Sequence, residues 1–93
     1  MALSVPAAPI NLTATVEKNG QITLKWADKS NNETGFQVER SNDGSVFAVI
    51  ATAATNATNY KDTRAVAGQI YYYRVAAKNN VGLSSYGNVV TVP

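Results

Sequence analysis

Carboxylates are the side chains of this sequence that could do acid–base chemistry. A glycosidase, for example, needs two of them on either side of one cleft, with pKa values set apart. The chain has no histidine and no cysteine, so the commonest general base and the thiolate ligands of metals are missing. The expected strand pattern spreads the six acidic residues over both ends and one face of the fold: Glu17, Asp28, Glu33, Glu39, Asp43 and Asp62. The sequence therefore predicts no enzyme, no catalytic residue and no cofactor.

One polar stretch, DKSNNE, has the ligand spacing of a calcium loop. Asp28, Ser30 and Asn32 stand at alternate positions, and Glu39 is the twelfth residue counted from Asp28. However, Glu33 occupies the position where such a loop needs glycine, and Glu39 lies in the middle of an expected strand. We therefore expect no metal here, and expect the Glu33 carboxylate to accept backbone N–H groups of the loop over 28–34.

Charge and hydropathy exclude two further classes of partner. The net charge is +2, and no run of lysine or arginine occurs, so the basic footprint of a nucleic-acid-binding protein is missing. No apolar run approaches the ~18–20 residues of a membrane span. The start MALSVPAAP lacks the basic and apolar regions of a signal peptide. Residues 1–5 are expected to be a linker or residues added for expression, and residues 6–93 a single domain.

Apolar residues alternate with polar ones along most of the chain, as in half-buried β-strands. The segment QITLKW, for example, places Ile22, Leu24 and Trp26 on one face. Seven strands are expected, at 9–16, 20–27, 34–41, 45–51, 57–60, 69–78 and 85–92. Seven short strands in 93 residues predict an all-β, antiparallel sandwich.

Turn signals separate the expected strands. Asn19-Gly20 and Asp43-Gly44 are typical of two-residue hairpins. In the type I′ turn that such pairs favour, both central residues have positive φ. We therefore expect both residues of Asn19-Gly20 to adopt positive φ.

Three adjacent tyrosines, Tyr71, Tyr72 and Tyr73, suggest an aromatic platform for a ligand. A strand turns successive side chains to opposite faces, so the three cannot form one surface. Tyr71 and Tyr73 are expected to point into the core, and Tyr72 outward. The Tyr71 hydroxyl should bond to backbone in the turn before its strand, because a buried hydroxyl without a partner costs ~1–3 kcal/mol.

Several segments together resemble a fibronectin type III domain, in the order and spacing of that family. They are LKWAD, ETGFQVERSNDG, Tyr60 with Asp62, and YYYRVAAKNNVGLSSYGN, and the likeness runs from about Pro6 to Pro93. The pattern D-x-S-x-x-E-x-G-F-x-V-x-R-S is similar to copies in prokaryotic secreted enzymes and surface proteins. The resemblance implies an immunoglobulin-like sandwich of seven antiparallel strands, with sheet ABE packed on sheet C′CFG. It implies a structural core that includes Trp26, Phe36, Tyr60, Tyr71 and Tyr73.

The resemblance also implies a function. We expect a noncatalytic module that acts as a spacer or support between neighbouring domains of a larger secreted or cell-surface protein, such as a carbohydrate-active enzyme. The module is expected to be monomeric and extracellular. Arg40 and Asp62 should end their strands at the same end of the sandwich and form an ion pair. The integrin tripeptide of animal members, Arg-Gly-Asp, is absent, so integrin binding is not carried over.

Two alternatives stay open. The module could bind polysaccharide or protein through its loops or its C′CFG face, and the candidate contacts are then Tyr72, Asn79, Asn80 and Tyr86. It could instead be an engineered scaffold. The loops are rich in Asn, Ser and Thr rather than in Tyr and Trp, which does not resemble a surface selected for binding.

Overall fold

A computed structural model describes residues 4–92 of the chain. The expectations for Met1–Leu3 and Pro93 therefore lie outside the described residues. The described chain consists of seven strands joined by turns and loops: β1 (Ile10–Val16), β2 (Ile22–Ala27), β3 (Gly35–Ser41), β4 (Ala48–Ala54), β5 (Asn59–Asp62), β6 (Tyr71–Lys78) and β7 (Val90–Val92). Residues 4–92 form no helix, so none of them builds a helical membrane span.

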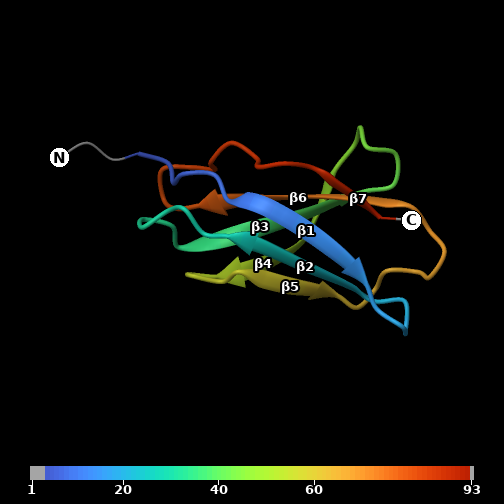
Figure 1. The fold of residues 1–93 in the computed structure, drawn as a ribbon. Helices are drawn as coiled ribbons and strands as arrows, with labels where there is room; N and C mark the ends of the chain where they lie inside the picture. The colour runs from blue at the N-terminus through green and yellow to red at the C-terminus, as the bar shows by residue number, and fades with distance from the viewer. Residues whose placement is uncertain (1–3, 93) are drawn as a thin grey trace.

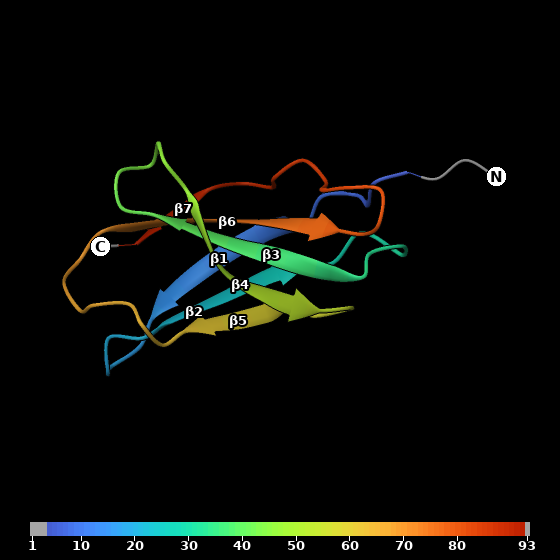
Figure 2. The ribbon, with the colours of Figure 1, turned by 180° about the vertical axis from the view of Figure 1, so that it is seen from behind.

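The strands form two antiparallel sheets that pack face to face (Figures 1 and 2). One sheet has the order β1-β2-β5, and the other has the order β4-β3-β6-β7. These are the sheets ABE and C′CFG, so the predicted seven-stranded immunoglobulin-like sandwich is confirmed. The two ends of the described chain, residues 4 and 92, lie toward opposite ends of the long axis (Figure 1).

The core lies between the sheets and follows the alternation of the strands. Trp26 and Phe36 come from opposite sheets, and their rings meet with centroids 5.5 Å apart. The indole Nε1 of Trp26 is buried and has no hydrogen-bond partner among the described residues, so apolar packing alone holds this ring. The other large buried side chains of the core are Leu12, Ile22, Leu24, Val38, Tyr71, Tyr73, Val75 and Val92.

Strand bounds differ from the sequence prediction in the second half of the chain. The fourth strand covers 48–54 rather than 45–51, the fifth 59–62 rather than 57–60, and the seventh 90–92 rather than 85–92. The fourth strand begins late because the Asp43 carboxylate accepts hydrogen bonds from the backbone N–H groups of Ser45 and Val46, at 2.8 and 3.0 Å. A side chain thus holds in a loop the backbone that alternation assigns to a strand.

The expectation of a type I′ turn at Asn19-Gly20 is wrong. Gly20 has φ of 86°, but Asn19 is not among the residues with positive φ. Gly20 N–H instead donates to Glu17 C=O at 3.0 Å, and Glu17 N–H donates to Gln21 C=O at 2.7 Å. These bonds form a longer hairpin loop with one glycine in the left-handed region. The Asn19 side chain favours this form, because its Oδ1 accepts the N–H of Gln21 at 3.0 Å.

The sandwich has two lateral edges, and contacts between the sheets cover them to different degrees. On the side of β1 and β7, the amide of Asn88 bonds both backbone groups of Leu12, at 2.9 and 3.0 Å, and so acts as a short strand partner. Gly87 lies so close to this edge that a Cβ would stand 2.2 Å from the Pro9 carbonyl oxygen. On the other side, β4 and β5 each pair on one side only.

Candidate functional site

Two of the candidate contact residues, Tyr72 and Tyr86, lie on the outer side of the four-stranded sheet. Strand pairing places Glu39 opposite Arg74 on this face. The Tyr86 hydroxyl donates to Glu39 Oε2 at 2.6 Å. Arg74 donates to Glu39 Oε1 through Nη2 at 2.8 Å and through Nε at 2.9 Å. We call Glu39, Arg74 and Tyr86 the outer cluster. Their polar groups are directed at one another, so the ring of Tyr86 is anchored within the chain.

Aromatic rings cover the arginine of the outer cluster. The Arg74 guanidinium carbon lies 3.7 Å from the centroid of the Tyr86 ring and 4.1 Å from that of Phe47. These groups leave Glu39 only 4% exposed. Burial opposes ionisation of Glu39, but hydrogen bonds from Tyr86, Gln37 and Arg74 together outweigh it and lower the pKa of this carboxyl.

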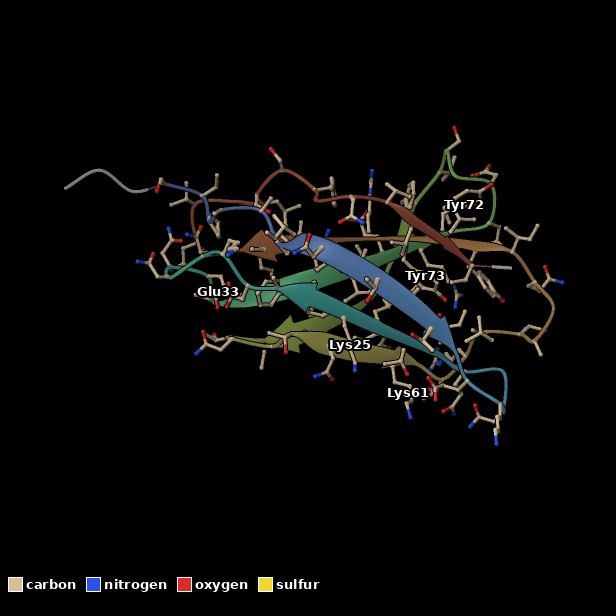
Figure 3. All side chains as sticks on the ribbon, in the orientation of Figure 1. Lys25, Glu33, Lys61, Tyr72 and Tyr73 are labelled. Carbon is tan, nitrogen blue, oxygen red and sulfur yellow. The ribbon has the colours of Figure 1, made fainter. Side chains whose placement is uncertain are left out.

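Tyr72 points outward and is half-buried. Pairing sets it beside Ser41 of β3 and Thr91 of β7. A Cβ added to Gly44 would lie 3.2 Å from the Tyr72 ring, so the loop between β3 and β4 rests on one side of this ring. In Figure 3 Tyr72 lies beside that loop, whereas Tyr73 lies between the two sheets. No aromatic contact joins Tyr72 to the outer cluster among the described residues, so the two tyrosines do not form a continuous platform.

The other two candidate contacts, Asn79 and Asn80, lie in the loop after β6. The Asn79 Nδ2 donates to the backbone oxygens of Ser4 at 3.0 Å and of Asn32 at 3.3 Å. Its Oδ1 accepts the N–H groups of Val81 and Gly82. Asn79 thus fastens the N-terminal segment to two loops, whereas Asn80 is exposed to solvent.

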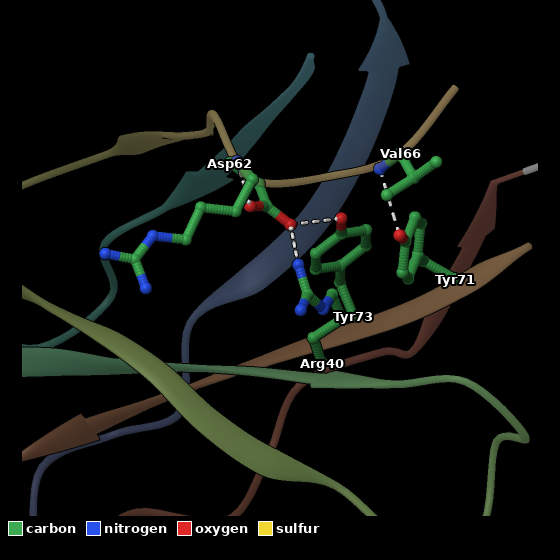
Figure 4. Close-up of polar contacts among 6 residues, drawn as sticks. Arg40, Asp62, Val66, Tyr71 and Tyr73 are labelled. Atoms are coloured by element: carbon green, nitrogen blue, oxygen red, sulfur yellow. Dashed lines mark hydrogen bonds and ion pairs between the residues drawn. The ribbon is translucent and has the colours of Figure 1, made fainter. Parts of the chain in front are cut away.

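A second carboxylate cluster lies between the sheets and consists of Asp62, Arg40 and Tyr73, which we call the inner cluster (Figure 4). Asp62 Oδ2 accepts hydrogen bonds from Arg40 Nη1 at 2.8 Å and from the Tyr73 hydroxyl at 2.6 Å. The Arg40–Asp62 ion pair is present as predicted. Burial, followed by the neighbouring Asp62 carboxylate, raises the pKa of Tyr73, so this hydroxyl stays a donor.

The expected bond of Tyr71 is also present. The backbone N–H of Val66, in the turn before β6, donates to the Tyr71 hydroxyl at 2.9 Å (Figure 4). The Arg40 guanidinium stacks 4.9 Å from the centre of the same ring. Two neighbouring inward tyrosines thus meet different partners, one a carboxylate and one the backbone.

Glu33 and Asp28 also accept backbone N–H groups. The Glu33 carboxylate accepts the N–H of Asn56 at 2.9 Å, a donor from the loop between β4 and β5. Asp28 accepts the N–H of Ser30 at 2.9 Å, and Glu39 of the candidate calcium spacing belongs to the outer cluster. Within residues 4–92, no three acidic side chains gather as a metal would require.

A cleft of about 460 Å³ opens between the edges of β4 and β5, and neither composition nor strand pattern pointed to it. Residues from both sheets line it: Arg40, Val49, Ile50, Tyr60, Asp62, Thr63 and Arg64. Tyr60, a candidate core residue, is half-buried, because it packs against the core and also lines this cleft. Sequence reasoning missed the cleft because it depends on where two edge strands part.

Comparisons with known proteins agree with this architecture. A crystal structure of a Fn3-like protein from Clostridium thermocellum has 32% sequence identity and a TM-score of 0.82, and the match covers 97% of this chain and 94% of that one. The β-1,2-glucanase from Parabacteroides distasonis has 26% identity and a TM-score of 0.80, over 96% of this chain and 13% of the enzyme. The amylopullulanase of Thermoanaerobacterium saccharolyticum is 33% identical over 91 residues, which are 97% of this chain but 7% of the enzyme.

Fold and contacts therefore define an immunoglobulin-like β-sandwich with two polar clusters that are bonded within the chain. The family model of the fibronectin type III domain matches residues 7–93. The chain belongs to the fibronectin type III family, as its sequence motifs predicted. It corresponds in length to a small segment of the enzymes that it matches.

Proposed function

We propose that this chain is a noncatalytic module of a larger extracellular enzyme that acts on polysaccharide. In this proposal the module supports and spaces the neighbouring domains, which are its partners. The observation that carries the proposal is the match of nearly the whole chain to 7% of an amylopullulanase. A segment of that size within a long enzyme fits an accessory unit rather than a catalytic domain.

The shape of the module supports a spacing role. Its Cα trace extends 49 Å along the long axis and 24 Å and 19 Å across it. Because the chain enters and leaves toward opposite ends, neighbours on either side are kept apart by the length of the sandwich (Figure 1). Asn79 and Asn32 both bond the backbone oxygen of Ser4, which gives the entering segment a fixed direction.

A domain exchange tests the proposal. In the Thermoanaerobacterium saccharolyticum amylopullulanase, the matching 91-residue segment is deleted, replaced by a Gly/Ser linker of equal length, or replaced by this chain. We expect deletion and linker to lower the thermal midpoint of the enzyme, and this chain to restore it. The isolated 93-residue chain should show no hydrolysis of pullulan.

Two results would overturn the proposal. Hydrolysis by the isolated chain would make it catalytic. A flexible linker that serves as well as this chain would show that no folded spacer is needed, because a Gly/Ser linker holds no fixed separation.

A binding role for Tyr72, Asn79, Asn80 and Tyr86 stays a prediction. Tyr86 and Asn79 hold the fold through the bonds described above. Retention on cellulose, chitin or xylan that Tyr72→Ala abolishes would support it. Equal elution of the wild-type chain and Tyr72→Ala from all three would contradict it.

A further inference from the structure

The cleft between β4 and β5 is a feature of the described surface that the proposed function does not use. It lies at the side of the sandwich where both edge strands lack a second partner. Tyr60 and Asp62 pair with inward residues of β2, namely Leu24 and Ile22, so their side chains enter the cleft from the core side. A volume of about 460 Å³ is in the range of small-molecule sites, roughly 300–1,000 Å³.

The charges that line the cleft do not cancel. Arg40 and Arg64 contribute two positive charges, and Asp62 contributes one negative charge. Asp62 is already committed, since its carboxylate accepts bonds from Arg40, Tyr73 and the backbone N–H of Arg64. Among residues 4–92, Arg64 has no carboxylate within ion-pair distance. One guanidinium is therefore available to an incoming anion.

Arg40 also keeps donors that its ion pair does not use. In the described chain, the guanidinium of Arg40 bonds Asp62 through Nη1 alone, and 23% of the Arg40 side chain is exposed. Guanidinium groups present several N–H donors in a plane that matches the two oxygens of a carboxylate. Each of the two arginines that line the cleft thus has free donors of the kind that binds a carboxylate.

The remaining walls are suited to a ring that is partly apolar and partly hydroxylated. The lining of the cleft is mostly polar, and Val49, Ile50 and Tyr60 contribute its smaller apolar part. Tyr60 and Thr63 are the lining residues that carry a hydroxyl group. Sugar rings present this combination of C–H faces and hydroxyl edges.

We infer that the cleft binds a hexuronate, a sugar unit that carries a carboxylate, with Arg64 as its principal ionic contact. The carboxylate would meet Arg64 and Arg40, and the ring would lie against Tyr60 and the β4 side chains. This inference is independent of the spacing role, because it is tested on the isolated chain.

The test is a titration of the ¹⁵N-labelled chain with sodium galacturonate at constant ionic strength, followed by NMR. We expect saturable shifts at the amides of Val49, Ile50, Thr63 and Arg64, with a dissociation constant in the range of about 1–10 mM, typical of single weak sites. Arg64→Gln should weaken binding by about fivefold or more, because it removes a charge-assisted contact. Arg64→Lys should fall between the two, because it keeps the charge but loses the planar donors.

Lys61→Gln is the matched control. It removes one positive charge, but Lys61 pairs with Thr23 of β2, is exposed (Figure 3) and does not line the cleft. It should change the affinity by less than about twofold, because exposed distant charges are screened. Unchanged thermal midpoints of both variants would show that folding is not the cause.

Several outcomes would overturn the inference. They are an absence of saturable shifts, shifts centred elsewhere on the chain, or an equal loss of affinity in Lys61→Gln and Arg64→Gln. Glucose that binds as tightly as galacturonate would remove the role of the carboxylate. Sulfate that binds as tightly at the same residues would show a site for a bare anion and not for a sugar.

Discussion

The inner and outer clusters are built from the same three groups and serve different parts of the molecule. Each joins a carboxylate to an arginine at 2.8 Å and to a tyrosine hydroxyl at 2.6 Å. Each carboxylate is almost fully buried, at 2% exposure for Asp62 and 4% for Glu39. Charge, geometry and burial are therefore closely matched, and the difference lies in what the clusters connect.

The inner cluster joins the two sheets. Asp62 belongs to the sheet β1-β2-β5, while Arg40 and Tyr73 belong to the other sheet, so its bonds cross the core. In the outer cluster, Glu39 and Arg74 lie on one sheet. They bind Tyr86, which lies in the irregular segment between β6 and β7. The same chemistry thus holds layers together in one place and anchors a connection in the other.

Removal of the inner carboxylate should have the largest effect. Asp62→Ala leaves Arg40 and the Tyr73 hydroxyl without their partner inside the sandwich, and we expect a loss of about 3–5 kcal/mol in the free energy of unfolding. Urea denaturation measures it. The exposed neighbour Lys61→Ala should stay within about 0.5 kcal/mol. An equal, small loss in both variants would show that the inner cluster does not stabilise the packing of the two sheets.

Neutralisation of the outer carboxylate should cost less. Glu39→Gln keeps the size of the side chain but weakens its bonds to Arg74 and Tyr86, and we expect a loss of about 1–2 kcal/mol. Hydrogen exchange should speed up at the amides of the segment before β7 and not at those of β2. A loss larger than that of Asp62→Ala would reverse the ranking of the two clusters.

A neutral hydrogen bond sets the scale for both clusters. Tyr71→Phe removes only the bond from the Val66 N–H, so the free energy of unfolding should fall by about 1 kcal/mol. Tyr72→Phe is the control, because this tyrosine faces outward and should change stability by less than about 0.5 kcal/mol. An unchanged denaturation midpoint in Tyr71→Phe would contradict the role given to its hydroxyl.

The pH dependence of the outer cluster should give the smallest effect. The pKa of Glu39 is lowered in the folded chain, so its stabilisation is fully present above the unfolded pKa of about 4.3 and is lost as pH falls through the folded pKa. The difference in unfolding free energy between wild type and Glu39→Gln should therefore shrink from pH 7 toward pH 3.

The pKa of a second carboxyl, that of Asp43, is also lowered, but its contribution cancels in this comparison. Backbone N–H groups of Val46 and Ser45 lower the pKa of Asp43 to about 2. Asp43 is present in both proteins, so its contribution cancels in the difference. A difference between wild type and Glu39→Gln that does not change with pH would contradict the lowered pKa of Glu39.

Much of the fold could be predicted, because each strand carries its own pattern. Alternation placed Tyr73 inward and Tyr72 outward, and the structure has both orientations. The pairing of Arg40 with Asp62 followed from the expected strand ends. The start of β4 was mistaken because Asp43 bonds the backbone that follows it, a competition that alternation does not register.

The partners of several polar side chains could not be predicted. Tyr86 lies 47 residues from Glu39, and Asn79 lies 75 residues from Ser4. Both Tyr86 and Asn79 are in irregular segments, where no periodicity indicates the direction of a side chain. The cleft beside Tyr60 could not be predicted either, because it depends on the separation of β4 from β5.

The sequence by itself determined the class of fold, the inward face of each strand and membership of the fibronectin type III family, because these depend on short-range periodicity and on local motifs. It showed three tyrosines in a row, and the pleat alone separates them. Only the tertiary structure decided that Tyr73 meets Asp62, that Tyr86 covers Arg74, and that Arg64 lines a cleft. Such contacts join residues distant in the chain, and the path of the loops brings them together.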